Sequence, residues 1–257
     1  MRLFFALLST NLQAVLALRT TFWIQALFMA LNNVIFFVFW WVLFERFDEI
    51  RGWRIEDVAA LFGVSAAGFG MARIFAGGLD GLAERIDGGQ LDPLLVQPRS
   101  VLLMTLGSRT NADGWGDVLS GFVLLAFSGY LSGVGLVLAP LAVLLSGLAF
   151  TASGLLINCL AFWLGRVDDL ARLIWDFLLV FSVYPPSLFG GALRVVLYTL
   201  IPAGFVAYLP TELLRNPAVN TLVIASLGAA LYAVLAAWVF SRGLRVYASG
   251  SRFGVRD

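Results

Sequence analysis

Residues 21–44, TFWIQALFMALNNVIFFVFWWVLF, contain no charged side chain. A helix needs about 20 apolar residues to cross the hydrocarbon core of a bilayer, so this run is long enough to span a membrane. The whole chain has the same character, because 60% of its 257 residues are apolar and only 13% are charged. Soluble domains contain about 25% charged residues. The sequence therefore predicts an all-α integral membrane protein that crosses the bilayer several times.

Six apolar stretches fit transmembrane helices within a single domain of residues 1–257. They cover residues 21–44, 58–78, 115–134, 136–164, 170–184 and 218–241. Residues 1–20 differ, because a helix there places polar and apolar residues on opposite sides. The polar side holds Arg2, Ser9 and Gln13, and the apolar side holds Phe4, Leu8, Leu12 and Val15. That pattern is typical of a helix lying in the membrane interface.

The loop arginines predict the orientation, since arginine and lysine accumulate in cytoplasmic loops. With the N-terminus inside, the inner side holds Arg2, Arg19, Arg85, Arg99, Arg109, Arg166, Arg172, Arg242, Arg245, Arg252 and Arg256. The outer loops hold Arg46, Arg51, Arg54 and Arg215. We therefore expect a multi-pass protein of the inner cell membrane with both termini in the cytoplasm.

Several kinds of chemistry are missing from the sequence. The chain has no histidine, which excludes His-dependent nucleophilic catalysis and His-ligated metals. Its one cysteine, Cys159, lies in an apolar run and is read as a small buried hydrophobe. There is no GxxxxGK[ST] phosphate loop and no basic patch dense enough for nucleic acid. We expect no catalytic residue, bound metal or cofactor in this chain.

Residues 79–100, LDGLAERIDGGQLDPLLVQPRS, form an unusual predicted cytoplasmic loop. Apolar residues at helical spacing predict one short helix, which Gly88 and Gly89 end. Asp92 and Pro93 fit the start of a second short helix. The leucines in and next to this second helix (Leu91, Leu94 and Leu95) must be shielded from water. Either they dip into the lipid interface or pack on neighbouring spans, or they dock into a soluble partner.

Residues 170–217 are too long for one span and too short for two ordinary spans. Helix-breaking residues divide this region: Tyr184-Pro185-Pro186, Gly190-Gly191, Pro202 and Pro210. Non-helical backbone at membrane depth must be buried in protein or face a water-filled cavity. The plain alternative is a long structured loop outside the membrane.

A few polar residues lie inside the predicted spans. Arg73 and Asp176 have similar predicted depths, and each would cost about 2.5–3.5 kcal/mol on an isolated inserted helix. We predict that they pair; snorkelling and an ion relay are the alternatives. Asn32 and Asn33 lie in the middle of the first span, where amides bond between helices or contact a substrate. With Phe36 and Tyr184 they are candidates to line a pathway.

The quoted segments carry a family resemblance that covers nearly the whole chain. The segment ERIDGGQLDPLLVQPRS, residues 84–100, resembles the cytoplasmic loop of type-2 ABC exporter permeases. Residues 184–214, YPPSLFGGALRVVLYTLIPAGFVAYLPTELL, resemble a second signature of one subgroup of that family. The resemblance implies that residues 79–100 form a coupling helix in a groove of a separate ATPase subunit. The implied contact residues are Leu91, Leu94, Leu95, Glu84 and Arg99.

The resemblance also implies short re-entrant helices at residues 185–217 on the outer side, and an assembly of two permeases with two ATPases. The second permease would be another copy of this chain or a homologue, and the partner ATPases would bind ATP and magnesium. The sequence thus predicts the permease of an ATP-driven exporter that moves an amphipathic or hydrophobic substrate out of the cytoplasm or inner leaflet. The permease itself would be in contact with membrane lipid.

Two other functions fit the sequence less well. An ion-coupled secondary transporter would normally contain internal repeats and an ion site at the membrane midplane. The sequence shows no convincing repeat of half its length. An intramembrane enzyme is disfavoured because histidine is absent and no cluster of Ser, Asp or Glu is evident at one depth in several spans.

Overall fold

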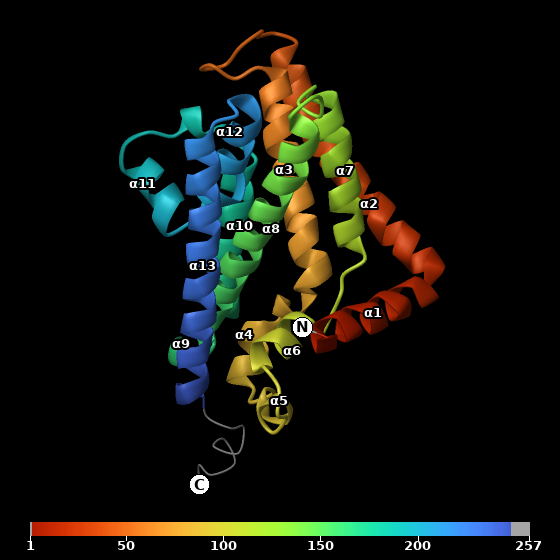
Figure 1. Cartoon of the computed structure of the whole chain (residues 1–257), viewed down its shortest axis with the longest axis vertical. Helices are drawn as coiled ribbons and strands as arrows, with labels where there is room; N and C mark the ends of the chain where they lie inside the picture. Colours follow the sequence, from red (N-terminus) through yellow and green to blue (C-terminus); the bar gives the residue numbers. More distant parts are fainter. Residues whose placement is uncertain (1, 248–257) are drawn as a thin grey trace.

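The computed structural model shows an all-helical bundle, as predicted (Figure 1). It describes residues 2–247, so the predicted inner arginines Arg252 and Arg256 lie outside the described residues, as does the side chain of Arg2. In this part of the chain, six helices run along the bundle: α2 (Arg19–Phe44), α3 (Ile55–Phe75), α7 (Asp113–Phe127), α8 (Gly135–Cys159), α10 (Asp168–Ser182) and α13 (Val219–Val246).

The helices differ in length. Within residues 2–247, four helical stretches are long and apolar enough to cross a membrane: α2, α3, α13, and α8 together with the short α9 (Ala161–Leu164). Helices α7 and α10 have 15 residues each, or about 22 Å at 1.5 Å per residue. A hydrocarbon core is about 30 Å thick. The number of six spans therefore stays a prediction.

The third predicted span, residues 115–134, ends earlier than expected. Helix α7 stops at Phe127, and the chain then passes through Gly129 (φ 75°) and Gly133 (φ 54°). These are left-handed conformations that glycine adopts without strain. The apolar character continues past Phe127, but the backbone geometry ends the helix there.

Helix α3 lies at the centre of the bundle. Its most apolar stretch is 78% buried, whereas the corresponding stretch of α2 is 17% buried and that of α13 is 22% buried. Helices α7 and α8 both pack against α3. Because α2 and α13 leave most of their apolar surface uncovered, lipid or another protein must cover them.

Glycines bring α3 and α7 into close contact. A Cβ atom on Gly63 would lie 2.8 Å from the backbone oxygen of Gly121. A Cβ atom on Gly121 would lie 2.6 Å from the backbone nitrogen of Ala67. Real Cβ atoms do not approach backbone this closely, so the packing depends on glycine. Small residues of this kind allow helices to pack closely in membranes.

The connections gather at the two ends of the bundle (Figure 1). One end, called the α5 end here, holds α1 (Arg2–Ala17), α4 (Leu82–Asp87), α5 (Asp92–Leu95) and α6 (Val101–Leu106). The other, called the α12 end, holds residues 45–54, the turn between α7 and α8, and α12 (Leu209–Arg215). The predicted inner loops thus share one end and the predicted outer loops the other.

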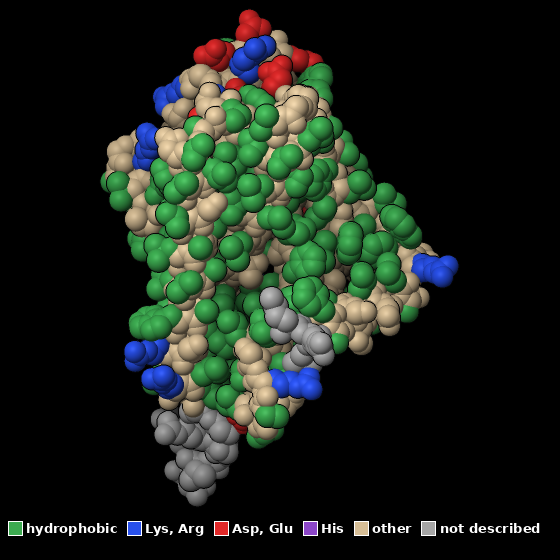
Figure 2. All heavy atoms as spheres, viewed as in Figure 1, with side chains coloured by type: hydrophobic (Ala, Val, Ile, Leu, Met, Phe, Trp, Pro, Cys, Tyr) green, Lys and Arg blue, Asp and Glu red, His purple; other side chains and the backbone are tan. Residues whose placement is uncertain are grey.

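The surface divides in the same way. Figure 2 shows hydrophobic side chains over the middle of the molecule, with charged side chains gathered near its two ends. A transmembrane protein is expected to expose such an apolar band to lipid. Which end faces the cytoplasm remains a prediction from the arginines.

Helix α1 lies across the α5 end rather than along the bundle (Figure 1). Leu8 is buried against the protein, while Ser9 and Gln13 are exposed, in agreement with the two sides predicted for this helix. Asn11 Nδ2 donates a hydrogen bond to the carbonyl oxygen of Gly107, at a distance of 2.7 Å. This bond ties α1 to the segment that follows α6.

The chain between α10 and α13 is broken, as predicted. Helix α11 (Gly191–Thr199) follows Gly190, and the next helical stretch, Gly204–Arg215, is inclined to it by 76°. Pro202 lies in the break between them. The sequence predicted a helix break at Pro210, and this is wrong. Pro210 lies in the first turn of α12, where proline is compatible with a helix.

Candidate functional site

Residues 79–100 form the two short helices that the sequence predicted. Helix α4 is followed by Gly88 and Gly89, and Pro93 lies in the first turn of α5. Val96 is 84% exposed and Leu95 is 42% exposed, and Arg99 is also exposed. We call Leu95, Val96 and Arg99 the α5 patch. It presents apolar side chains beyond the end of the bundle.

Leu91 does not belong to this patch, contrary to the prediction that it contacts the ATPase. It is completely buried in a cluster with Leu82 and with Phe240 of α13. Its backbone nitrogen donates a hydrogen bond to the Tyr247 hydroxyl (3.1 Å). Neighbouring helices therefore cover Leu91, which was the alternative interpretation of these leucines. Leu94 is partly buried against the same cluster.

The two short helices are fixed to the long ones. Asn158, in the last turn of α8, accepts a hydrogen bond from the backbone nitrogen of Ala83 through Oδ1 (2.9 Å). Its Nδ2 donates to the carbonyl oxygen of Gly154 (2.8 Å), so both ends of the amide are used. Glu84, the other predicted contact residue, is exposed on α4. The Asn158 amide therefore bonds α4 to the end of α8.

Arg73 has partners other than the predicted Asp176. Its Nη1 lies 2.8 Å from Asp80 Oδ2, and its Nη2 lies 2.6 Å from Asp113 Oδ2. Arg73 is in the last turn of α3, and its long side chain extends past the helix end toward the α5 end. The predicted pair assumed that two charges at similar depth must meet, whereas nearer carboxylates bind both terminal nitrogens of Arg73 and leave its Nε without a partner.

Asp176 is exposed on α10 and has no ion-pair partner among residues 2–247. Its neighbours on the exposed surface of α10 are Arg172, one turn earlier, and the apolar side chains of Leu173 (52% exposed), Phe177 (45%) and Val180 (50%). A carboxylate among such residues is costly if lipid surrounds it. This surface of α10 therefore needs a polar cover or access to water.

Two adjacent cavities lie between α2 and the rest of the bundle. The larger, about 720 Å³, lies between α1, α2 and the segment before α7; its polar lining includes Asn11, Gln25, Arg73, Arg109, Asn111 and Asp113. We call it the polar vestibule. The smaller, about 230 Å³, lies between α2, α3 and α10; four phenylalanines line it (Phe36, Phe62, Phe69 and Phe150). We call it the aromatic cavity. Met29 and Asn32 line both, so the two cavities adjoin.

Three of the four predicted pathway residues line the aromatic cavity. These are Asn32, Asn33 and Phe36. Tyr184 is not among its lining residues; its ring lies 5.3 Å from that of Trp40. Trp40 is buried, so this part of α2 packs into the protein core.

Asp117, which the sequence analysis did not single out, also lines the aromatic cavity. It is 1% exposed, and Asn33 Nδ2 donates hydrogen bonds to its Oδ1 (2.7 Å) and to Ser120 Oγ (2.9 Å). Asn33 therefore joins α2 to α7, as expected for an amide between membrane helices. The Asp and the Ser of this cluster both come from α7, so the cluster does not unite Ser, Asp or Glu side chains from several spans.

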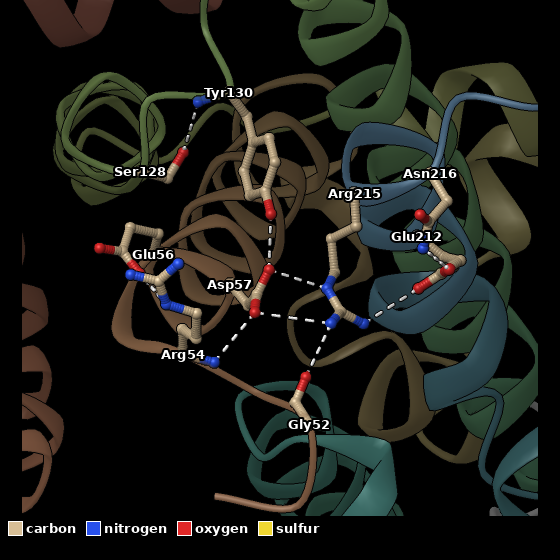
Figure 3. Close-up of polar contacts among 9 residues, drawn as sticks. All are labelled: Gly52, Arg54, Glu56, Asp57, Ser128, Tyr130, Glu212, Arg215 and Asn216. Atoms are coloured by element: carbon tan, nitrogen blue, oxygen red, sulfur yellow. Dashed lines mark hydrogen bonds and ion pairs between the residues drawn. The ribbon is translucent and has the colours of Figure 1, made fainter. Parts of the chain in front are cut away.

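A second polar cluster, at the α12 end, centres on Asp57 (Figure 3). Arg215 Nε donates to Asp57 Oδ1 (2.8 Å), and the Tyr130 hydroxyl donates to the same oxygen (2.6 Å). The backbone nitrogen of Arg54 donates to Asp57 Oδ2 (2.9 Å). The Arg215 guanidinium also lies 4.2 Å from the centre of the Trp53 ring. The cluster ties α12 to the start of α3 and to the turn after α7.

Tyr130 lies in that turn, outside the long helices. Burial, together with its hydrogen bond to the Asp57 carboxylate, raises the pKa of Tyr130 to about 12. The hydroxyl therefore stays protonated and keeps its donor role at neutral pH.

Comparison with known protein families identifies a family for this chain. A family model described as ABC-2 family transporter protein matches residues 30–251. The chain belongs to this family. No curated protein and no solved structure matches the chain.

The ABC-2 match covers every part of the site described above except α1 and the first turns of α2. It confirms the family that the loop sequences resembled. Permeases of the ABC-2 family are the transmembrane components of ABC transporters and act with ABC ATPase subunits. The chain is therefore an ABC transporter permease and a multi-pass membrane protein.

Proposed function

We propose that this ABC-2 permease is half of an ATP-driven exporter for an amphipathic or hydrophobic substrate. The observation that carries the proposal is the family match over residues 30–251, which includes the α5 patch and all of the aromatic cavity lining except Met29. Two partner ATPases bind and hydrolyse ATP with magnesium. The complex lies in the inner cell membrane, with both termini of this chain in the cytoplasm.

The α5 patch seats in the ATPase. Leu95 and Val96 are exposed apolar side chains that the bundle leaves uncovered, and Arg99 and Glu84 add charges that can pair with the partner. When the ATPases close on ATP, they move α4 and α5. Asn158 passes this movement to α8, and the cluster around Leu91 passes it to α13.

The two cavities form this chain's part of the pathway. The substrate enters the polar vestibule near the α5 end and continues to the aromatic cavity between α2, α3 and α10. Beyond the cavity, the Asp57 cluster holds the α12 end together. Helices α11 and α12 dip into the membrane from this end as a re-entrant pair, and α7 and α10 complete six crossings.

A second permease completes the pathway by packing against α2 and α10. Both helices expose large apolar surfaces, and α10 carries Asp176 on its exposed side. A partner at this surface removes the apolar side chains from lipid and gives the Asp176 carboxylate a polar or aqueous environment.

The test is purification of the tagged permease from its host, followed by identification of the subunits bound to it. We expect an ATPase with a GxxxxGK[ST] loop to co-purify. Leu95→Asp combined with Val96→Asp should abolish this co-purification, because both residues are exposed and their loss leaves the fold intact. Leu91 is left unchanged in this variant, since it belongs to the core.

The matched control is Phe47→Asp. Phe47 is 54% exposed but lies in the loop at the α12 end, away from the ATPase. The control should retain the ATPase. If the Leu95 and Val96 variant folds and still retains the ATPase, α5 is not the docking element.

A further inference from the structure

One oxygen of the Asp117 carboxylate has no partner. Asn33 binds Oδ1, whereas Oδ2 is buried and makes no hydrogen bond with any described residue. Burying a carboxylate without satisfying it is costly, and such groups are rare in native structures. A buried acid that lines a cavity within a membrane helix bundle is a candidate for contact with what the cavity binds.

Asp117 has no ion-pair partner among the described residues. The nearby guanidinium of Arg73 binds Asp80 through Nη1 and Asp113 through Nη2, and its Nε makes no hydrogen bond. The same guanidinium lies 5.8 Å from the centre of the Phe69 ring. The aromatic cavity thus has a buried acid with one oxygen that no described residue binds.

The rest of the cavity wall suits a cation with apolar groups attached. The rings of Phe69 and Phe150 pack against each other with centroids 5.6 Å apart, and Phe36 and Phe62 add two more rings to the lining. Aromatic faces attract alkylated ammonium groups, and the attraction increases where water is excluded. Val180 of α10 lines the cavity, and Asp176 lies one helical turn before it. Asp176 therefore places a second carboxylate near the aromatic cavity.

We propose that the aromatic cavity binds organic cations, with Asp117 as their counter-ion and the phenylalanines as their apolar cage. The proposal names the substrate class of the pathway and so rests on the proposed function for its role in export. The binding itself requires neither ATP nor the ATPase. It can therefore be tested on the permease alone.

The probe is radiolabelled benzyltrimethylammonium, a water-soluble cation, in equilibrium dialysis against the purified permease. Phenylmethanesulfonate, of similar size and opposite charge, is the control ligand. We expect the cation to bind and the anion not to bind. Asp117→Asn should weaken cation binding at least about tenfold, since a contact to a charged group is lost. The substitution preserves shape and keeps an oxygen that can accept from Asn33.

Two more variants make the test decisive. Asp169→Asn removes the same charge from an exposed position at the start of α10 and should leave cation binding unchanged. Phe36→Leu removes a ring at a position that is 60% exposed, so the fold tolerates it, and should weaken binding of the cation. If Asp117→Asn does not fold, the Phe36 variant and the comparison of the two ligands still decide.

Equal binding of cation and anion would overturn the proposal, as would a folded Asp117→Asn variant with unchanged cation affinity. Co-purification of the ATPase separates this outcome from failure of the proposed function. A permease that recruits its ATPase but does not select cations refutes the cation site alone. A permease that binds the cation but recruits no ATPase refutes the exporter and leaves the site standing.

Discussion

Replacing Arg215 by alanine should make the α12 end easier to unfold. The guanidinium bonds Asp57, Glu212 and the carbonyl oxygen of Gly52. The side chains of Arg215 and Asp57 are only 19% and 8% exposed. Removing one member of a buried pair costs about 3–5 kcal/mol, because the other charge stays buried.

We expect the lower end of that range, about 3 kcal/mol. Tyr130 and the backbone nitrogen of Arg54 still donate to Asp57 after the substitution. For a chain of this size, 1 kcal/mol corresponds to about 2–4 °C in the midpoint of thermal unfolding, so the midpoint should fall by about 6–12 °C. The assay is thermal unfolding of the detergent-purified permease, followed by size-exclusion chromatography after each heating step.

Arg54→Ala is the matched control, because it removes the same charge at the same end. Arg54 pairs with Glu56 at 3.6 Å, and their side chains are 68% and 42% exposed. Such a surface pair contributes less than about 1 kcal/mol. Equal shifts of the unfolding midpoint for Arg215→Ala and Arg54→Ala would refute the reasoning. Burial would then make no difference to the contribution of an ion pair to stability.

Three further predictions follow from packing and titration. Gly121→Ala should lower the midpoint of thermal unfolding strongly, because the added Cβ atom would meet the α3 backbone. Gly190→Ala should leave the midpoint unchanged, because a Cβ atom there meets no other atom within 4 Å. Equal midpoints for the two variants would contradict the close packing of α3 and α7. Leu91→Asp should reduce the yield of folded protein because the position is fully buried, and exposed Leu95→Asp should not; equal yields would place Leu91 at the surface. The pKa of Tyr130 is raised from about 10 to about 12, so the stabilising contribution of its hydroxyl is complete below pH 10 and is lost as pH rises through about 12. Absorbance titration at 295 nm should therefore lose a component near pH 12 in Tyr130→Phe, and an unchanged titration would refute the burial of this hydroxyl.

The sequence predicted those features that depend on local composition. The uncharged run at residues 21–44 became α2, and glycine and proline marked the limits of α4, α5 and α11. These features are local because hydropathy, helix breaking and first-turn proline act within a few residues. The family resemblance rested on the same glycines, prolines and leucines.

The contacts between distant segments were harder to predict. Leu91 and Leu95 have the same chemistry, and only the position of α13 decides that one is buried and the other exposed. Arg73 and Asp176 matched in predicted depth, but depth along a helix does not state which way a side chain turns. Asp80 and Asp113 are closer to Arg73 because α3 ends two residues after it.

Asp117 could have been found from the sequence. It is an acid inside the predicted span 115–134, and an ionisable residue within a span is by default a candidate functional residue. Gly116, Ser120 and Gly121 around it also indicated a side of the helix that packs closely on its neighbours. Its partner Asn33 could not be identified, because that contact depends on how α2 crosses α7.

In the proposed working exporter, two permeases assemble with two ATPases. The most direct measurement is the mass of the complex purified with its partners in lipid nanodiscs, resolved by native mass spectrometry. We expect two permeases, each of 28.0 kDa for this chain, together with two ATPase subunits. A complex that hydrolyses ATP and transports its substrate with one permease, or with no ATPase bound, would contradict it.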